Sequence, residues 1–296
     1  MPGTPLTIDA ELALDAHARL GEGPIWDAEG GRLVWVDIHA EAVHLFEPSS
    51  GFDQALQAGQ HVGAAAVRSR GGLILAARDG FVLLDPATGA LEPFAAAKED
   101  PSTRFNDGKC DAAGRFWAGT MAYAFTPGAG SFYRLDPDGS VTAMFGDVAV
   151  SNGLGWSPDW RTMYYIDTPT RGVDAFDFDL AAGTIANRRR AVEIPREAGG
   201  LPDGMCVDAE GCLWVAIVRS GSVQRYTPDG RLDRTVRLPT SGVTSCCFGG
   251  ADLGDLYITT SAELVPEDQR TAQPHAGGLF ICRPGVGGQP PCTFGG

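Results

Sequence analysis

The chain has 296 residues, and its 23 Lys and Arg residues against 37 Asp and Glu residues give a net charge of -14 at pH 7. This charge repels phosphate backbones and anionic lipid surfaces, so neither nucleic acid nor a membrane is an expected partner. The 40 glycines and 20 prolines, many of them in Asp-Gly or Pro-Asp-Gly turns, predict an all-β protein with few long helices.

The first residues lack the basic flank and apolar core of a signal peptide, because Asp9, Glu11 and Asp15 interrupt them. The 7 cysteines have neither a CxxC nor a zinc-site spacing. We therefore expect a cytoplasmic protein with reduced thiols.

Six strand-like runs recur along the chain, each introduced by a Gly or Asp turn. They are LVWVD at Leu33, LILAA at Leu73, RFWAG at Arg115, MYYID at Met163, CLWVA at Cys212 and DLYIT at Asp255. Their central residues, which are Trp35, Leu75, Trp117, Tyr165, Trp214 and Tyr257, lie 40 to 49 positions apart by subtraction. This period is typical of propeller blades.

A second strand ending in a turn follows every run, as in SFYRLDPDG from Ser131 and SVQRYTPDG from Ser222. Meanders that cannot bury a face alone stack radially, so the sequence predicts a six-bladed β-propeller of four-stranded blades, with residues 1–296 as one domain. The alternative, a β-helix, has much shorter repeats.

The two ends of the chain should share a blade, since an open blade would expose a strand edge. Residues Leu6 to Leu14 alternate as a strand does. We expect this strand to close the ring by completing the blade that contains Leu279 and Phe280. The Gly- and Pro-rich tail after Pro284 is predicted to be loose.

Polar residues occupy one phase of the repeat, 11 to 13 positions before each central residue. The six positions hold Glu22, Gly63, Asn106, Asn152, Asp203 and Ser245. Equivalent positions in a ring of blades lie at the same end, so these side chains should converge on the mouth of the central channel. Two carboxylates with an amide predict a hard oxygen site for one divalent ion such as Ca²⁺, Mg²⁺ or Mn²⁺.

The strings RFNDGK with AGTMA, SNGLGWS, PDGMCVDAEGCLWVA, TSCCFGG and QPHAGGLF together resemble the regucalcin (senescence marker protein) and gluconolactonase family, from Gly21 to about Phe280. The resemblance implies a propeller that binds one divalent metal and hydrolyses sugar lactones. It implies Glu22, Asn152 and Asp203 as metal ligands, and Arg104 and Asn106 as substrate contacts.

The sequence departs from the family's pattern shortly after AGTMA. Where the family carries a substrate-contacting Glu, this chain has Tyr123, Ala124 and Phe125, with Ala124 at the matching place. The departure bears on sugar specificity and leaves the predicted metal site whole.

A lactone hydrolase needs an activated water and a group that stabilises charge on the carbonyl oxygen. A metal can supply the second as a Lewis acid, with Ca²⁺ first and Zn²⁺, Mn²⁺, Mg²⁺ or Fe²⁺ as alternatives. Asp203 is the predicted general base, and Asp107 is a candidate for orienting Arg104. The expected partner is a small sugar lactone bound by a monomer.

Two other classes of function stay open. A propeller esterase acting on another ester or a phosphotriester would require a more apolar mouth. The other class is a non-catalytic calcium-binding or scaffold propeller. A scaffold would lack acids in phase, and the WD-repeat signature is absent from the sequence.

Overall fold

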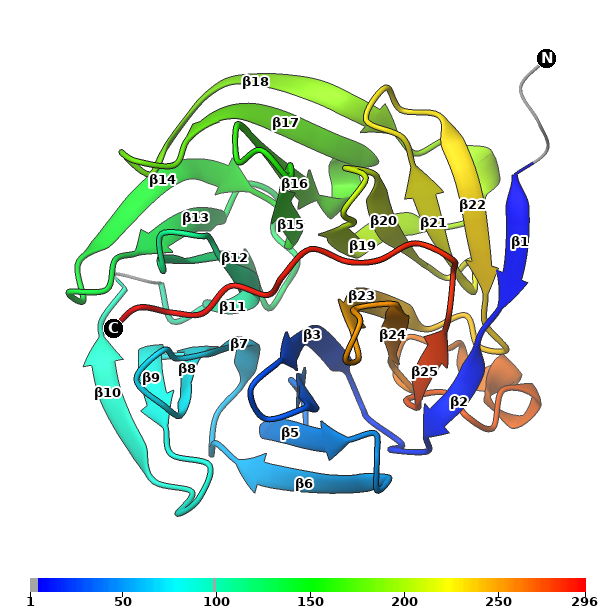
Figure 1. Ribbon diagram of the computed structural model, residues 1–296, viewed down its shortest axis with the longest axis horizontal. Helices are drawn as coiled ribbons and strands as arrows, with labels where there is room; N and C mark the ends of the chain where they lie inside the picture. Colours follow the sequence, from blue (N-terminus) through cyan, green and yellow to red (C-terminus); the bar gives the residue numbers. More distant parts are fainter. Residues whose placement is uncertain (1–4, 98–99) are drawn as a thin grey trace.

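Six β-sheets stand around a central axis in the computed structural model, which describes residues 5–97 and 100–296 (Figure 1). This confirms the predicted six-bladed β-propeller. The short 3₁₀ helices η1 (Thr168–Thr170), η2 (Arg196–Ala198) and η3 (Glu267–Ala272) lie in connections between strands. Within the described ranges, no helix is long and apolar enough to cross a membrane.

Every blade runs outward from an innermost strand. Blade 1 has β3 (Gly21–Asp27), β4 (Arg32–Asp37), β5 (Ala42–Glu47) and β6 (Phe52–Gln57), and blade 2 has β7 (Val62–Val67), β8 (Leu73–Ala77), β9 (Gly80–Leu84) and β10 (Leu91–Ala95). Blade 3 has β11 (Thr103–Cys110), β12 (Phe116–Ala122), β13 (Gly130–Leu135) and β14 (Val141–Val148), and blade 4 has β15 (Ser151–Trp156), β16 (Thr162–Asp167), β17 (Gly172–Asp179) and β18 (Thr184–Glu193). Blade 5 has β19 (Leu201–Val207), β20 (Leu213–Val218), β21 (Ser222–Tyr226) and β22 (Leu232–Arg237), and blade 6 has β23 (Val243–Gly249), β24 (Asp255–Thr260) and β25 (Leu279–Cys282).

The six repeated runs form the second strand of each blade, and their central residues lie in the core between blades. All six central side chains are at most 1% exposed. Trp117 of blade 3 contacts Trp156 of blade 4 with ring centroids 6.2 Å apart, and Trp214 of blade 5 contacts Phe248 of blade 6 at 5.7 Å. Aromatic rings at two of these positions therefore join blade 3 to blade 4 and blade 5 to blade 6, as stacked repeats require.

A break in strand pairing recurs near the start of each innermost strand. The register shifts fall between Glu22 and Ile25, Val62 and Ala64, Phe105 and Asp107, Ser151 and Leu154, Pro202 and Met205, and Val243 and Ser245. Such bulges release residues from the regular alternation of a strand and change the direction of a side chain. They coincide with the phase of the repeat at which the polar residues were found.

The N-terminal segment closes the ring but differs from the single strand that we predicted. It forms two strands separated at Ala10. β2 (Glu11–Leu14) pairs with β25 and completes blade 6, as expected, whereas β1 (Leu6–Asp9) pairs in parallel with β22 and adds a fifth strand to blade 5. The segment therefore joins the outer edges of two neighbouring blades.

The predicted loose tail is instead an ordered strap that crosses one end of the ring (Figure 1). Residues 285–296, called the strap below, form backbone bridges from Phe294 to Arg68 and from Gly288 to Asp208. Phe294 is fully buried, and Gln289 donates from Nε2 to the Trp156 carbonyl at 2.9 Å. The prediction was wrong because backbone hydrogen bonds to several blades fix a segment whose composition is that of a flexible one.

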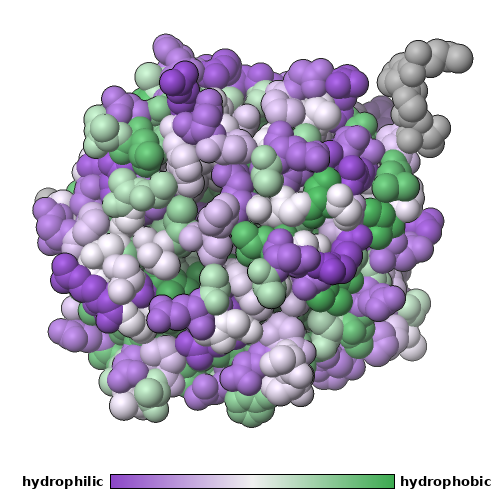
Figure 2. All heavy atoms as spheres, in the orientation of Figure 1, coloured by the Kyte–Doolittle hydropathy of each residue, from purple (hydrophilic) through white to green (hydrophobic). Residues whose placement is uncertain are grey.

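The strap lies above a cavity of about 110 Å³ on the axis, whose lining includes Trp26, Lys109, Cys206 and Pro290. The outer face of the molecule on this side intersperses hydrophilic and hydrophobic residues (Figure 2). The polar residues of the phased set start their strands at the opposite end of the axis, so the strap leaves that end uncovered.

Two truncations test the closure of the ring. Removing the chain through Asp9 takes away only the fifth strand of blade 5, whereas removal through Leu14 leaves blade 6 with three strands and an exposed edge. We expect the longer truncation to lower the melting temperature by more than about 10 °C or to aggregate, and the shorter one to cost only a few degrees. Thermal unfolding and size-exclusion chromatography measure both, and equal melting temperatures would contradict closure by β2.

Candidate functional site

Four side chains of the phased set meet at one end of the axis, supplied by the innermost strands of blades 1, 3, 4 and 5. Glu22, Asn106, Asn152 and Asp203 lie on β3, β11, β15 and β19 and are 3 to 6% exposed. Asn106 donates from Nδ2 to the Ser151 carbonyl at 2.7 Å, and the same Nδ2 lies 3.4 Å from Asn152 Oδ1. The structure therefore brings together four of the five polar residues that the repeat predicted, without Ser245, whereas Gly63 supplies no side chain.

Glycines beside these residues allow the innermost strands to approach one another. A Cβ atom on Gly153 would lie 2.6 Å from the Met205 nitrogen, and one on Gly204 would lie 2.0 Å from Ser245 Oγ. Both distances are too short for any larger residue without displacement of a strand. The glycine after Asn152 and the one after Asp203 therefore set how closely these two polar groups are held.

The Asn152 amide is oriented by Thr168, which sequence reasoning did not single out. Asn152 donates from Nδ2 to Thr168 Oγ1 at 2.8 Å, and that hydroxyl donates to the Pro202 carbonyl at 2.9 Å. Since the hydroxyl proton is used toward Pro202, the amide must present its NH₂ group to Thr168. The amide oxygen Oδ1 is then available as a ligand atom.

The carboxylates of Glu22 and Asp203 are held in an unfavourable environment. Burial, followed by the charges of Asp203 and Asp107, raises the pKa of Glu22 well above its ordinary value. Burial and the charge of Asp107 likewise raise the pKa of Asp203, opposed by a hydrogen bond from Asn152 and by Arg104. Acids gathered without a bound cation favour their protonated forms.

Asp107 is a third buried carboxylate at this site. Burial raises the pKa of Asp107 to about 6, against the opposing charge of Lys109 and the hydrogen bond from the Gly108 N–H. Lys109 in turn donates from Nζ to the Met205 carbonyl at 2.7 Å. Only its position next to Asn106 in the sequence could have drawn attention to Asp107.

Arg104 lies beside these acids, and 5% of it is exposed. It donates from Nη1 to Asn106 Oδ1 at 2.6 Å and to the Phe105 carbonyl at 3.0 Å. Asn106 therefore orients Arg104, and the sequence-based assignment of that part to Asp107 is not what the structure shows. Burial lowers the pKa of Arg104, while Tyr123, Glu22 and Asp203 oppose that shift.

The donor set fits a hard divalent cation. Across the described ranges, none of Glu22, Asp107 and Asp203 forms an ion pair with a Lys or Arg side chain. Carboxylate and amide oxygens with no thiolate or imidazole among them are the ligands that Ca²⁺ and Mg²⁺ take. A bound cation would remove the mutual repulsion that now raises the pKa values of these acids.

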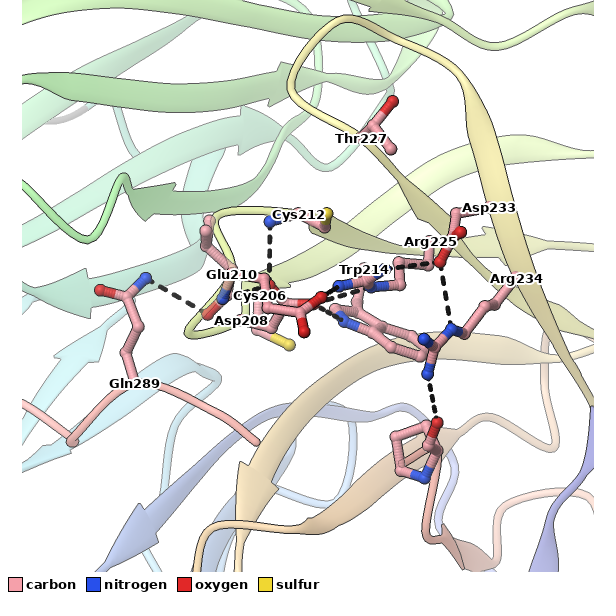
Figure 3. Close-up of polar contacts among 12 residues, drawn as sticks. Cys206, Asp208, Glu210, Cys212, Trp214, Arg225, Thr227, Asp233, Arg234 and Gln289 are labelled. Carbon is pink, nitrogen blue, oxygen red and sulfur yellow. Dashed lines mark hydrogen bonds and ion pairs between the residues drawn. The ribbon is translucent and has the colours of Figure 1, made fainter. Parts of the chain in front are cut away.

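A second acidic group, formed by Asp208, Glu210 and Cys212, also has three ligand atoms within 4.8 Å of one another. Its central carboxylate is already satisfied, since Asp208 accepts from Trp214 Nε1 at 2.9 Å and Arg225 Nε at 2.8 Å (Figure 3).

The same pattern recurs two blades away. Asp111 of blade 3 accepts from Trp117 Nε1 at 2.8 Å and Arg115 Nε at 2.7 Å. Both Asp residues also accept backbone N–H groups two and four positions onward. The repetition identifies the Asp208 group as a structural turn of the blade.

The fold and the site together define the class of the protein. It is a six-bladed propeller with buried carboxylates, an amide and a guanidinium at one end of its axis. Residues 20–262 match the family model described as the SMP-30/gluconolactonase/LRE-like region. The chain therefore belongs to the SMP-30/gluconolactonase/LRE-like family.

Similar proteins include sugar lactone lactonase YvrE of Bacillus subtilis (strain 168), whose name marks the activity as provisional. It is 40% identical over 98% of this chain and 99% of its own length. Regucalcin of Xenopus laevis is also 40% identical over the same shares.

Solved structures agree with this placement. A calcium-binding protein, regucalcin, of Agrobacterium tumefaciens superposes with a TM-score of 0.92 at 30% identity over 99% of both chains. A gluconolactonase of Xanthomonas campestris has a TM-score of 0.73 at 27% identity, covering 92% of this chain and 89% of its own.

The electrostatics of the acids predict how Glu22→Gln changes the metal-free protein. A pKa raised in the folded state means that folding takes up a proton, so stability falls as pH rises from the ordinary value of 4.5 through the raised one. Glutamine mimics the protonated acid. At about pH 7.5 the variant should therefore unfold at higher urea than wild type, with the difference disappearing near about pH 4.

Urea unfolding in a chelator measures this difference, with the exposed Glu92→Gln as the control that should match wild type at every pH. A Glu22→Gln protein less stable than wild type at neutral pH would show that the carboxylate is stabilised as an anion by some other group.

Proposed function

We propose that the chain is a metal-dependent hydrolase that opens a sugar (aldono) lactone to the aldonic acid. The observation that supports this most is the convergence of Glu22, Asn152 and Asp203 beside a buried Arg104 at the uncovered end of the axis. Membership of the gluconolactonase-containing family and the names of the relatives support this reaction class.

Glu22 and Asp203 would hold the ion through their carboxylates, and Asn152 would hold it through its amide oxygen. When bound, the ion supplies Lewis-acid stabilisation of negative charge on the lactone carbonyl oxygen. We propose Ca²⁺ because all three ligands are oxygens and because the Agrobacterium relative is described as calcium-binding.

Asp203 acts as the general base in this proposal. It accepts a proton from water as the water oxygen bonds to the carbonyl carbon, and it returns that proton to the ring oxygen as the ester C–O bond breaks.

Arg104 and Asn106 would position the lactone. Among the residues that the structure describes, Arg104 donates only from Nη1, so the rest of its guanidinium can donate to ring or carbonyl oxygens. The hydrogen bond from Arg104 to Asn106 fixes both side chains before substrate arrives, which lowers the entropy cost of binding.

A matrix of substrates and ions tests the proposed function. Metal-stripped protein is assayed with gluconolactone, an aryl ester and a phosphotriester, each with Ca²⁺, Mg²⁺, Mn²⁺ and Zn²⁺. We expect hydrolysis of the lactone only after an ion is added, and we expect Glu22→Gln to weaken calcium binding in calorimetric titration. Full activity in a chelator, or a preference for the aryl ester or phosphotriester, would contradict the proposal.

Asp203→Asn separates proton transfer from ion binding. The amide keeps one oxygen ligand but cannot accept a proton at neutral pH. At ion concentrations that titration shows to fill the site, we expect kcat to fall by about 10² to 10⁴, roughly 3 to 5 kcal/mol of barrier. Asn152→Asp, which keeps an oxygen ligand, should retain measurable turnover. Near wild-type kcat in ion-saturated Asp203→Asn would leave Asp203 only as a ligand.

A further inference from the structure

An arc of three rings, His39, His61 and Tyr123, stands at the site end of blades 1 to 3. His39 follows β4, His61 precedes β7 and Tyr123 follows β12, so three consecutive blades supply one ring each. The His39 and His61 centroids are 5.4 Å apart, and the His61 and Tyr123 centroids 5.6 Å apart. The site therefore has a continuous aromatic wall on one side.

Hydrogen bonds hold both ends of this arc. His39 Nδ1 lies 2.6 Å from Glu263 Oε2, and His61 Nδ1 lies 3.1 Å from the Tyr123 hydroxyl. Over the described residues, Nε2 of His61 has no hydrogen-bond partner. One imidazole nitrogen and the phenol oxygen are therefore available to a ligand.

Arg104 lies next to the arc. Burial lowers the pKa of His61, with further lowering by His39 and Arg104, and the Arg104 charge acts on Tyr123 against the effect of burial. Tyr123 is 39% exposed, whereas Arg104 is 5% exposed, so the rings lie nearer to solvent than the guanidinium. A molecule held by Arg104 would therefore extend past the rings toward solvent.

We propose that His61 and Tyr123 are specificity-determining residues that bind the neutral, hydroxylated ring of the lactone, with its C–H face on the Tyr123 ring and a hydroxyl on the Tyr123 oxygen or His61 Nε2. The inference rests on the proposed lactonase function and adds substrate recognition to it. The motifs in the sequence assigned no part to His61, and they placed Tyr123 only in the segment that lacks the family's substrate-contacting Glu.

The chemistry of these groups favours a neutral polyol. The C–H face of a sugar ring is apolar and packs on aromatic rings, which bury large area with little loss of side-chain entropy. A phenol oxygen and a neutral imidazole both accept hydrogen bonds, as hydroxyl groups require. A purely apolar ester would leave these polar atoms unpaired when bound, which disfavours it.

Three variants separate stacking from hydrogen bonding. For each variant, KM and kcat are measured with gluconolactone, and the inhibition constant is measured with valerolactone, a lactone ring without hydroxyl groups. Tyr123→Phe should raise KM about threefold and leave valerolactone inhibition unchanged, since only a hydrogen bond is lost. Tyr123→Ala should raise both constants about tenfold. His61→Ala should raise KM about threefold. In all three, kcat should stay within about twofold because the reacting atoms are untouched.

Phe125→Ala is the matched control, because Phe125 lies in the same loop, is 66% exposed and is outside the arc of rings. It should behave as wild type, and calorimetric calcium affinity should be unchanged in every variant. If Tyr123→Ala and His61→Ala both hydrolyse gluconolactone with the KM of the wild-type protein, this inference is overturned and the proposed function stands. A wild-type protein inactive on every lactone overturns the proposed function and this inference together.

Discussion

Bulges at one level of all six innermost strands are the constraint on which the rest of the structure depends. A strand that is buried on both faces has no place for a carboxylate, because regular alternation would direct it into a blade interface. Interrupted pairing around Glu22, Asn152 and Asp203 frees these side chains from that alternation. Pairing between the second and third strands, in contrast, has no register shift in any blade.

The bulges also explain why the sequence predicted so much of the site. Each blade interrupts its first strand at the same point. Glu22, Asn106, Asn152 and Asp203 therefore all lie 11 to 13 positions before the central aromatic residue of their blade. Asp107 lies one residue beyond the bulge of blade 3, within the paired strand. Its burial near the other acids depends on closure of the ring, which no local pattern encodes.

The two ends of the chain show where composition fails as a guide. Apolar and polar residues alternate from Leu6 to Leu12, so nothing in the pattern marks the change at Ala10 from the edge of blade 5 to that of blade 6. The strap has the glycines and prolines of a flexible tail, and its order comes from partners far away in the sequence. The largest apolar side chain of the strap is that of Phe294, which is fully buried.

The strap changes how the blades depend on one another. In a ring of repeats, each blade contacts only its two neighbours, so the energetics approach those of a one-dimensional chain whose units can open in turn. The strap joins non-neighbours: Phe294 donates to Val67 of blade 2, Gln289 to Trp156 of blade 4, and Gly288 to Leu253 beside blade 6. Opening one of these blades therefore disturbs contacts of another across the axis. Such a cross-connection favours unfolding as one cooperative unit over opening blade by blade.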